Sequence, residues 1–257
     1  QSSRARFQIV LMLYDITEVY MIEQMQDDFV SNASHELKTP ITAIAGFTET
    51  LLSGAKDDPE TLTQFLHIIA DESQRLIDLI QDVLSLSRIR AQVPSKGTKQ
   101  PVKLATVVGQ ELTLLQQSID QHQLTIDNQI SSTLTVPGDL QKLTPVIKNL
   151  LSNAIKYNRP RGRVTITAVT ETDQWLLRVQ DTGIGISAED QQRIFERFYR
   201  ASASRSQQEV SGTGLGLSIV KELVSAMHGH IQVTSQRGVG TTMTVSLPVQ
   251  SKKTAKD

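Results

Sequence analysis

The chain has 257 residues, of which 39% are hydrophobic and 21% charged, a composition typical of a soluble globular protein with two domains. Its net charge of -1 excludes the basic surface expected of a nucleic-acid-binding protein, and the absence of cysteine excludes disulfide bonds and thiolate chemistry. No apolar run is long enough to span a bilayer, so we expect any membrane contact to lie in segments outside this sequence.

The chain begins with a β-branched and aromatic run, residues 7–16, which has no helical period and predicts a strand. A lone strand cannot bury its side chains, so we expect residues 1–16 to be the last strand of a domain that continues upstream of this sequence. Residues 17–28 change to helical spacing and predict a helical linker that runs without a break into the next segment.

Residues 29–52 carry apolar side chains at three- and four-residue steps, which predicts an amphipathic helix. His35 lies two residues from Ala33 of the apolar stripe, and a rotation of roughly 100° per residue places its ring on the solvent face. Glu36 follows directly, and Pro40 removes the backbone hydrogen bond to the Glu36 carbonyl, which weakens the helix there. These residues predict a reactive histidine; a surface histidine on an ordinary helix is the alternative interpretation.

A second helix is expected after a turn at residues 54–59 (GAKDDP). Apolar residues recur every seven positions over residues 60–89, with companion positions between them, and form a seam of about four heptads. Two antiparallel helices alone leave too much apolar surface exposed, so we expect residues 29–90 to form a homodimeric four-helix bundle. A helix packed inside its own chain is the alternative. Residues 91–101 have no periodic pattern and predict a linker.

Residues 102–250 alternate helices and strands, and residues 251–257 form a short tail. The last four strands come as hairpin pairs, which favours a mixed sheet with helices on one face over a doubly wound fold. The expected fold class is therefore α+β, a helical hairpin followed by an α/β sandwich. The expected strands are residues 102–104, 123–130, 163–170, 174–180, 231–235 and 241–248, and the expected helices are residues 106–121, 138–157 and 215–227.

Three polar side chains share one face of the helix expected at residues 138–157. Asn149 and Asn153 lie four residues apart, and Lys156 follows three residues later. An amide oxygen is a neutral, hard ligand suited to Mg²⁺, which takes phosphate and water oxygens as its other partners. Polar residues on an ordinary solvated face are the alternative.

Two glycine-bearing turns follow along the chain. Asp181–Gly185 (DTGIG) comes after a strand, so its carboxylate could accept a hydrogen bond from the amine of a base, while the glycines let a flat ligand approach. Gly212–Gly216 (GTGLG) opens a helix, whose free N–H groups and positive dipole end suit phosphate. Residues 201–211 are polar and aperiodic and predict a mobile lid. Arg197 and Arg200 lie at its hinge, where they could reach a terminal phosphate.

Together and in this order, these motifs resemble the cytoplasmic catalytic core of bacterial two-component sensor histidine kinases. The resemblance covers nearly all of residues 17–250 and is carried by SHELKTP, NLLSNAIKY, DTGIGI, IFERFYR, GTGLGLSIV and GVGTT. GFTETLL is similar to phosphate-regulon sensor kinases, and residues 1–16 resemble the end of a PAS sensor domain. The sequence departs from the family at Ser211 and His230, where glycine is common, which bears on the behaviour of the lid.

The resemblance implies that MgATP phosphorylates His35 and that the phosphoryl group passes to an aspartate on the receiver domain of a response regulator. It implies Glu36 as the base that polarises the histidine, Thr39 as the residue that positions water for phosphatase activity, and Arg200 near the phosphates. Asn153 would hold Mg²⁺. The residues assigned to ATP are Asn149, Asn153, Lys156, Tyr157, Asp181, Gly183, Gly185, Gly212, Gly214, Leu215, Gly216, Leu217 and Thr242. The resemblance also implies a homodimer on the cytoplasmic side of the cell membrane, with no nucleic-acid partner.

Two other functions stay open. The second domain is also similar to the gyrase, mismatch-repair and heat-shock ATPases, so an ATP-driven conformational clamp is one of them. Those proteins carry a glutamate base near the position of Asn149 and have no histidine box. The other is a scaffold or dominant phosphatase in which His35 is hardly phosphorylated. For a kinase, the linker must let the second domain reach the histidine, and a bend at Pro40 could couple residues 17–28 to that docking.

Overall fold

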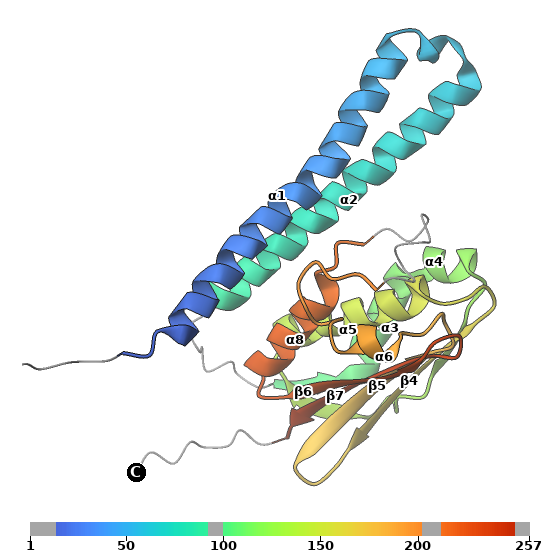
Figure 1. The fold of residues 1–257 in the computed structure, drawn as a ribbon. Coiled ribbons are helices and arrows are strands. Elements are labelled where there is room, and N and C mark those ends of the chain that lie inside the picture. The colour runs from blue at the N-terminus through green and yellow to red at the C-terminus, as the bar shows by residue number, and fades with distance from the viewer. Residues whose placement is uncertain (1–13, 92–99, 202–211, 250–257) are drawn as a thin grey trace, which may run out of the picture.

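A computed structural model describes residues 14–91, 100–201 and 212–249, and shows a long helical hairpin beside an α/β domain (Figure 1). Helix α1 spans Thr17–Leu52 and helix α2 spans Pro59–Ala91. The helix expected at residues 17–28 therefore does run without a break into the helix that carries the histidine. The strand expected at residues 7–16 falls outside the described residues except for Tyr14–Ile16, which lie in no helix or strand.

The turn between the two helices is built from one glycine and one acidic residue. Gly54 has a φ of 130°, a conformation that residues with a Cβ rarely adopt, and it lets the chain leave α1. A short 3-10 turn at Ala55–Asp57 follows. Asp58 then accepts the backbone N–H groups of Glu60 and Thr61, both at 3.4 Å, which caps the start of α2. The turn predicted from GAKDDP is confirmed.

Helix α2 keeps buried and exposed apolar residues on different faces. Leu79 and Leu86 are buried in the hydrophobic core. Ile77, Ile80 and Leu84 lie on another face at three- and four-residue spacing, and each is between 44% and 51% exposed. The hairpin by itself therefore leaves an apolar stripe uncovered, as expected of helices that pair with a second hairpin.

The second domain is a sheet covered on one face by helices (Figure 1). Its elements are β1 Gln100–Lys103, α3 Leu104–Leu114, α4 Gln116–Gln121, β2 Thr125–Asn128, β3 Thr135–Gly138, α5 Leu140–Lys156, β4 Arg163–Thr170, β5 Gln174–Asp181, α6 Ala188–Gln191, α8 Gly216–Ala226, β6 His230–Gln236 and β7 Gly240–Pro248. The five-stranded sheet has the order β2-β4-β5-β7-β6, and β1 pairs with β3 in a separate two-stranded sheet. Strand β2 is parallel to β4 while the other neighbours in the larger sheet are antiparallel, so the predicted mixed sheet is confirmed.

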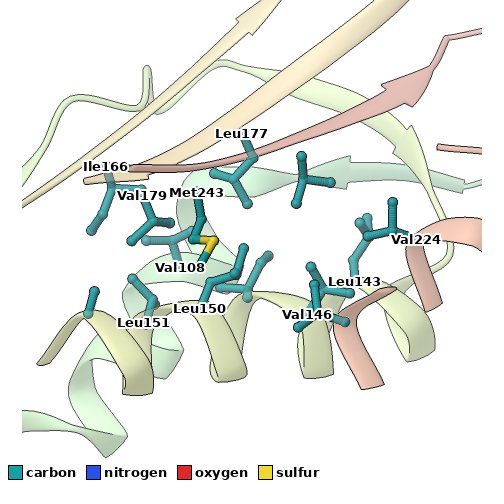
Figure 2. Close-up of a cluster of buried hydrophobic side chains, with 14 of the residues drawn as sticks. Val108, Leu143, Val146, Leu150, Leu151, Ile166, Leu177, Val179, Val224 and Met243 are labelled. Carbon is teal, nitrogen blue, oxygen red and sulfur yellow. The ribbon is translucent and has the colours of Figure 1, made fainter. Parts of the chain in front are cut away.

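The core lies between this sheet and helices α5 and α8. Asp139 caps α5 by accepting the N–H of Gln141 at 3.0 Å, and the apolar residues of the helix then recur at three- and four-residue steps. Figure 2 shows the side chains of Leu143, Val146, Leu150 and Leu151 facing those of Ile166, Leu177, Val179 and Met243. Burying each large aliphatic side chain contributes about 1.5–3 kcal/mol. This layer fixes α5 and therefore the polar residues on its opposite face.

The structure differs from the sequence prediction mainly at short elements. The helix expected at residues 106–121 begins at Leu104 and divides at Leu115 into α3 and α4. Strand β3 and helix α6, each of four residues, were not predicted. Most of the linker expected at residues 91–101 lies outside the described residues.

Candidate functional site

A cavity of about 720 Å³ opens between helix α2 of the hairpin and helices α5 and α8 of the second domain. Small-molecule sites in proteins typically have volumes of about 300–1,000 Å³. Most of the residues assigned to ATP from the sequence meet in its wall. They are Asn149, Asn153, Lys156, Tyr157, Asp181, Gly185, Gly212, Gly214, Gly216 and Leu217, together with Arg200.

Three of the assigned residues do not line this cavity. The Leu215 side chain is fully buried in the core, and Gly183 lies in the turn beyond Asp181. Thr242 is also absent from the cavity wall, whereas its neighbour Thr241 lines the cavity from strand β7. Side chains alternate between the two faces of a strand, so a shift of one position turns a residue away from the site.

The amide groups of α5 are oriented by the helix itself. Asn149 donates its Nδ2 to the carbonyl of Pro145 at 2.9 Å, one turn earlier, which leaves the amide oxygen free to face the start of α8. Asn153 lies one turn later in the cavity wall. Among the described residues, no group of three His, Cys, Asp or Glu side chains could hold a metal ion. This donor set suits Mg²⁺, which binds few protein oxygens when phosphate and water supply the others.

Asp181 lies at the end of β5, where it accepts two backbone N–H groups. Gly183 donates to its Oδ1 at 2.8 Å and Thr241 donates to the same oxygen at 3.2 Å. Burial raises the pKa of the carboxyl to about 6, although both hydrogen bonds oppose that shift. The carboxylate remains an acceptor at neutral pH and could bind the amine of a purine base.

Lys156 provides a cation in the cavity wall. Burial, together with the nearby positive charge of Arg200, lowers the pKa of its ammonium to about 8. The ammonium also lies 5.7 Å from the centre of the Tyr157 ring. No carboxylate of the residues that the structure describes forms an ion pair with this buried cation, which is therefore suited to an anionic ligand group such as phosphate.

The glycines at the start of α8 pack closely against polar side chains of α5. A Cβ at Gly212 would lie 2.9 Å from Lys156 Nζ, and a Cβ at Gly216 would lie 2.6 Å from Asn149 Oδ1. Gly214 has a φ of 71°, which favours glycine. These residues bring the N-terminal end of α8, with its positive dipole, beside the lysine and the amide.

Helix α2 closes the cavity from the hairpin side, a contribution that the sequence did not reveal. Arg75, Asp78 and Asp82 lie three and four residues apart on one face of α2 and line the cavity. Asp82 accepts a hydrogen bond of 2.7 Å from the hydroxyl of Thr213. Burial raises the pKa of Asp82, and the hydrogen bond from Thr213 opposes this. The spacing of these charged residues was visible in the sequence, but Thr213, the partner of Asp82, lies 131 residues further along the chain.

His35 and Thr39 lie on the open side of α1, whereas the side chain of Glu36 faces α2. His35 is exposed, as predicted from its place on the helix. Glu36 accepts a hydrogen bond of 3.3 Å from Arg75 across the hairpin. Thr39 donates its hydroxyl to the carbonyl of His35 at 3.3 Å, and its side chain is also exposed. The imidazole is therefore accessible to a second domain or a second protein.

The second domain contacts α1 through an aromatic pair. The rings of Phe29 and Phe198 lie 5.7 Å apart, and the guanidinium of Arg197 lies 5.6 Å from the Phe29 ring while its Nη2 donates to Glu222 at 2.6 Å. Arg197 and Phe198 lie shortly before the expected lid. Most of that lid, residues 202–211, lies outside the described ranges. In the described parts of the chain, no helix is long and apolar enough to cross a membrane.

Comparisons with known proteins match both parts of this arrangement. Residues 25–92 match the His Kinase A (phospho-acceptor) domain, and residues 138–251 match the histidine kinase-, DNA gyrase B- and HSP90-like ATPase family. Sensor histidine kinase WalK of Bacillus subtilis (strain 168) is 34% identical over 247 residues, which are 95% of this chain and 40% of WalK. The chain thus spans well under half the length of this relative.

Solved structures of two histidine kinases share this fold. Acinetobacter baumannii histidine kinase AdeS superposes with a TM-score of 0.66 at 27% identity, over 84% of this chain and 98% of AdeS. Histidine kinase ThkA, in complex with response regulator protein TrrA, shares the fold with a TM-score of 0.72 at 23% identity, over 93% of this chain and 66% of ThkA.

A phospho-acceptor hairpin joined to an ATPase domain defines the class of ATP-dependent protein-histidine kinases. The chain carries both domains and belongs to the sensor histidine kinase family.

Proposed function

We propose that this chain is a kinase core in which MgATP bound in the cavity phosphorylates His35. The observation that carries this proposal is a cavity of nucleotide size, with a carboxylate and a cation in its wall, that is closed by the same hairpin that bears an exposed histidine. An ATP-driven clamp would need the cavity but has no use for the acceptor helix.

In the proposed reaction, a ring nitrogen of His35 attacks the γ-phosphorus of ATP. The N–P bond forms while the bond from phosphorus to the β–γ bridging oxygen breaks, and ADP leaves. Such a transition state is loose, so the protein contributes mainly position and charge. Glu36 accepts a hydrogen bond from the N–H of the other ring nitrogen and stabilises the positive charge that develops on the ring.

The residues of the cavity have separate roles in this proposal. Asp181 accepts a hydrogen bond from the adenine amine, and Tyr157 packs beside the base. Lys156 and Arg200 neutralise phosphate charge, together with the free N–H groups at the start of α8. Asn153, with Asn149 beside it on α5, would hold Mg²⁺, which supplies further charge neutralisation when bound.

We further propose that the hairpin forms a homodimer and that phosphorylated His35 passes its phosphoryl group to an aspartate of a response regulator. The match to the phospho-acceptor domain and the uncovered apolar stripe of α2 support the dimer. The complex of ThkA with TrrA supports a regulator as partner. Thr39, exposed near His35, would position water in the reverse, phosphatase direction.

Incubation with γ-labelled ATP and Mg²⁺ tests the proposal. We expect label on the protein that acid removes and base does not, as for a phosphorylated histidine. His35→Gln should abolish the label and leave nucleotide binding intact, whereas Asn153→Ala should weaken nucleotide binding. Label that persists on the His35→Gln variant, or that survives acid, would contradict the assignment. ATP turnover with no label would favour the clamp.

A further inference from the structure

We propose that Arg75 is a positioning residue for autophosphorylation, which acts by holding the carboxylate of Glu36. This inference rests on the proposed function, in which Glu36 polarises His35. Arg75 lies on α2 and Glu36 on α1, 39 residues apart, yet Nη2 of the arginine lies 3.3 Å from Oε2 of the glutamate.

The guanidinium is held from two sides. Its Nη1 lies 3.8 Å from Oε2 of Glu72, one turn earlier on the same helix. The side chain of Arg75 is 21% exposed, compared with 38% for Glu36. A planar guanidinium between two carboxylates has little rotational freedom, and a charge-assisted hydrogen bond from it therefore restricts the more exposed carboxylate.

The position of Glu36 matters because it directly follows the acceptor. A carboxylate can fix which ring nitrogen carries the proton only if it stays near the imidazole. Without such a partner, a partly exposed glutamate side chain samples several rotamers. By pairing with Glu36 across the hairpin, Arg75 removes much of this freedom.

Arg75 also lines the cavity, so a direct role in binding ATP has to be separated from positioning. Its positive charge is near enough to Lys156 to contribute to the lowered pKa of that lysine. However, the guanidinium already faces two carboxylates, which a triphosphate would have to displace. Positioning therefore predicts an effect on kcat, whereas nucleotide binding by Arg75 predicts an effect on the KM for ATP.

The test is a double-mutant cycle on autophosphorylation, in the chain whose label on His35 has first been established. Arg75→Met keeps the aliphatic stem and removes the charge, and we expect kcat to fall about tenfold, below the hundredfold or more that loss of a base can cost. The KM for ATP should change less than about twofold. Arg75→Lys should recover part of the rate. In a Glu36→Gln background, Arg75→Met should have almost no further effect, because the two residues act as a unit.

Arg178→Met, on an exposed position of β5 outside the cavity, is the matched control and should leave both parameters unchanged. Thermal melting and the size of each variant show whether the hairpin remains folded. If Arg75→Met does not fold, the same cycle with Arg75→Lys must show a smaller loss that disappears in the Glu36→Gln background. Additive losses, a change confined to KM, or an unchanged rate would each overturn the proposal. Absence of label on wild-type His35 would instead refute the proposed function.

Discussion

The hydroxyl of Thr213 donates a hydrogen bond of 2.7 Å to the carboxylate of Asp82 and so joins the turn before α8 to helix α2. Thr213 lies between two glycines of the cavity wall, at the end where we propose that the phosphates bind. The carboxylate of Asp82 would repel a phosphate bound at this end, so we expect the docked hairpin and ATP to oppose each other there.

Removing this charge should strengthen nucleotide binding. Asp82→Asn keeps an oxygen that can accept from Thr213 but removes the negative charge, and we expect the Kd of a fluorescent ATP analogue to fall about three- to tenfold at low salt. Asp71→Asn removes an exposed charge from the same helix and should change little. Weaker binding by the Asp82→Asn variant would mean that the carboxylate assists the nucleotide.

Asp181 should make ATP binding sensitive to acid. Its pKa is raised to about 6, so the carboxyl becomes protonated and a poorer acceptor as the pH falls through that value. Because bound adenine favours the ionised form, binding below about pH 6 must also release a proton. Isothermal titration calorimetry at pH 5.5 in two buffers of different ionisation enthalpy measures this release. Asp181→Asn should weaken binding and abolish both the proton release and the loss of affinity at acid pH. Equal proton release by the variant would assign the effect to another group.

Lys156 should make binding sensitive to alkali. Burial lowers its pKa to about 8, so the ammonium loses its charge, and with it the attraction for phosphate, as the pH rises through that value. We expect Lys156→Met to bind ATP about tenfold more weakly, and its affinity to be nearly constant between about pH 7 and 9. Lys221→Met, an exposed lysine of α8, serves as the control. An alkaline limb that survives in the Lys156→Met variant would contradict this assignment.

Gly183 should be intolerant of even one methyl group. A Cβ there would lie 2.1 Å from the backbone carbonyl oxygen of Tyr157, so the strand end or the helix end must move. We expect Gly183→Ala to lower the free energy of unfolding of the ATPase domain by about 1–3 kcal/mol, measured by urea denaturation. A Cβ at Gly109, inside α3, meets nothing within 4 Å. Gly109→Ala should therefore be neutral or stabilising by up to about 1 kcal/mol, and an equal loss in both variants would exclude the steric explanation.

The uncovered stripe of α2 should be the dimer interface. Leu84 is 51% exposed and lies on a face away from the cavity-lining residues of the same helix. We expect Leu84→Lys to shift the chain from dimer to monomer in light scattering after size-exclusion chromatography, since an unpaired charge would have to be buried. ATP binding should not change. A similar substitution at Leu114, which is 76% exposed on α3, should leave the dimer intact.

The sequence predicted the long elements and most of the cavity wall because their patterns are local. The apolar period of α5 places Asn149 and Asn153 together on its polar face, and the glycines before α8 mark a turn beside a helix start. Thr241 was not singled out because the strand pattern predicted the element but not the face of it that lines the cavity.

Contacts between residues far apart in the sequence, within the hairpin and between the two domains, could not be predicted from the sequence. Asp82 with Thr213 and Glu36 with Arg75 are pairs of ordinary polar residues on helices, or beside one, with no spacing that links them. Only the antiparallel packing of the hairpin and the docking of the second domain bring these residues together. The inferences that go beyond the family motifs therefore depend on the structure.

Helix α1 is a single uninterrupted rod from Thr17 to Leu52. At a rise of about 1.5 Å per residue, His35 lies about 27 Å along the helix axis from Thr17. A rotation of the helix at Thr17 would be transmitted to His35 through a segment of α1 that contains no proline, because Pro40 lies beyond the histidine. Inserting or deleting one residue between Thr17 and His35 would rotate the acceptor by about 100° relative to the chain before Thr17. The number of residues in this part of α1 therefore sets the direction in which the imidazole points relative to that chain.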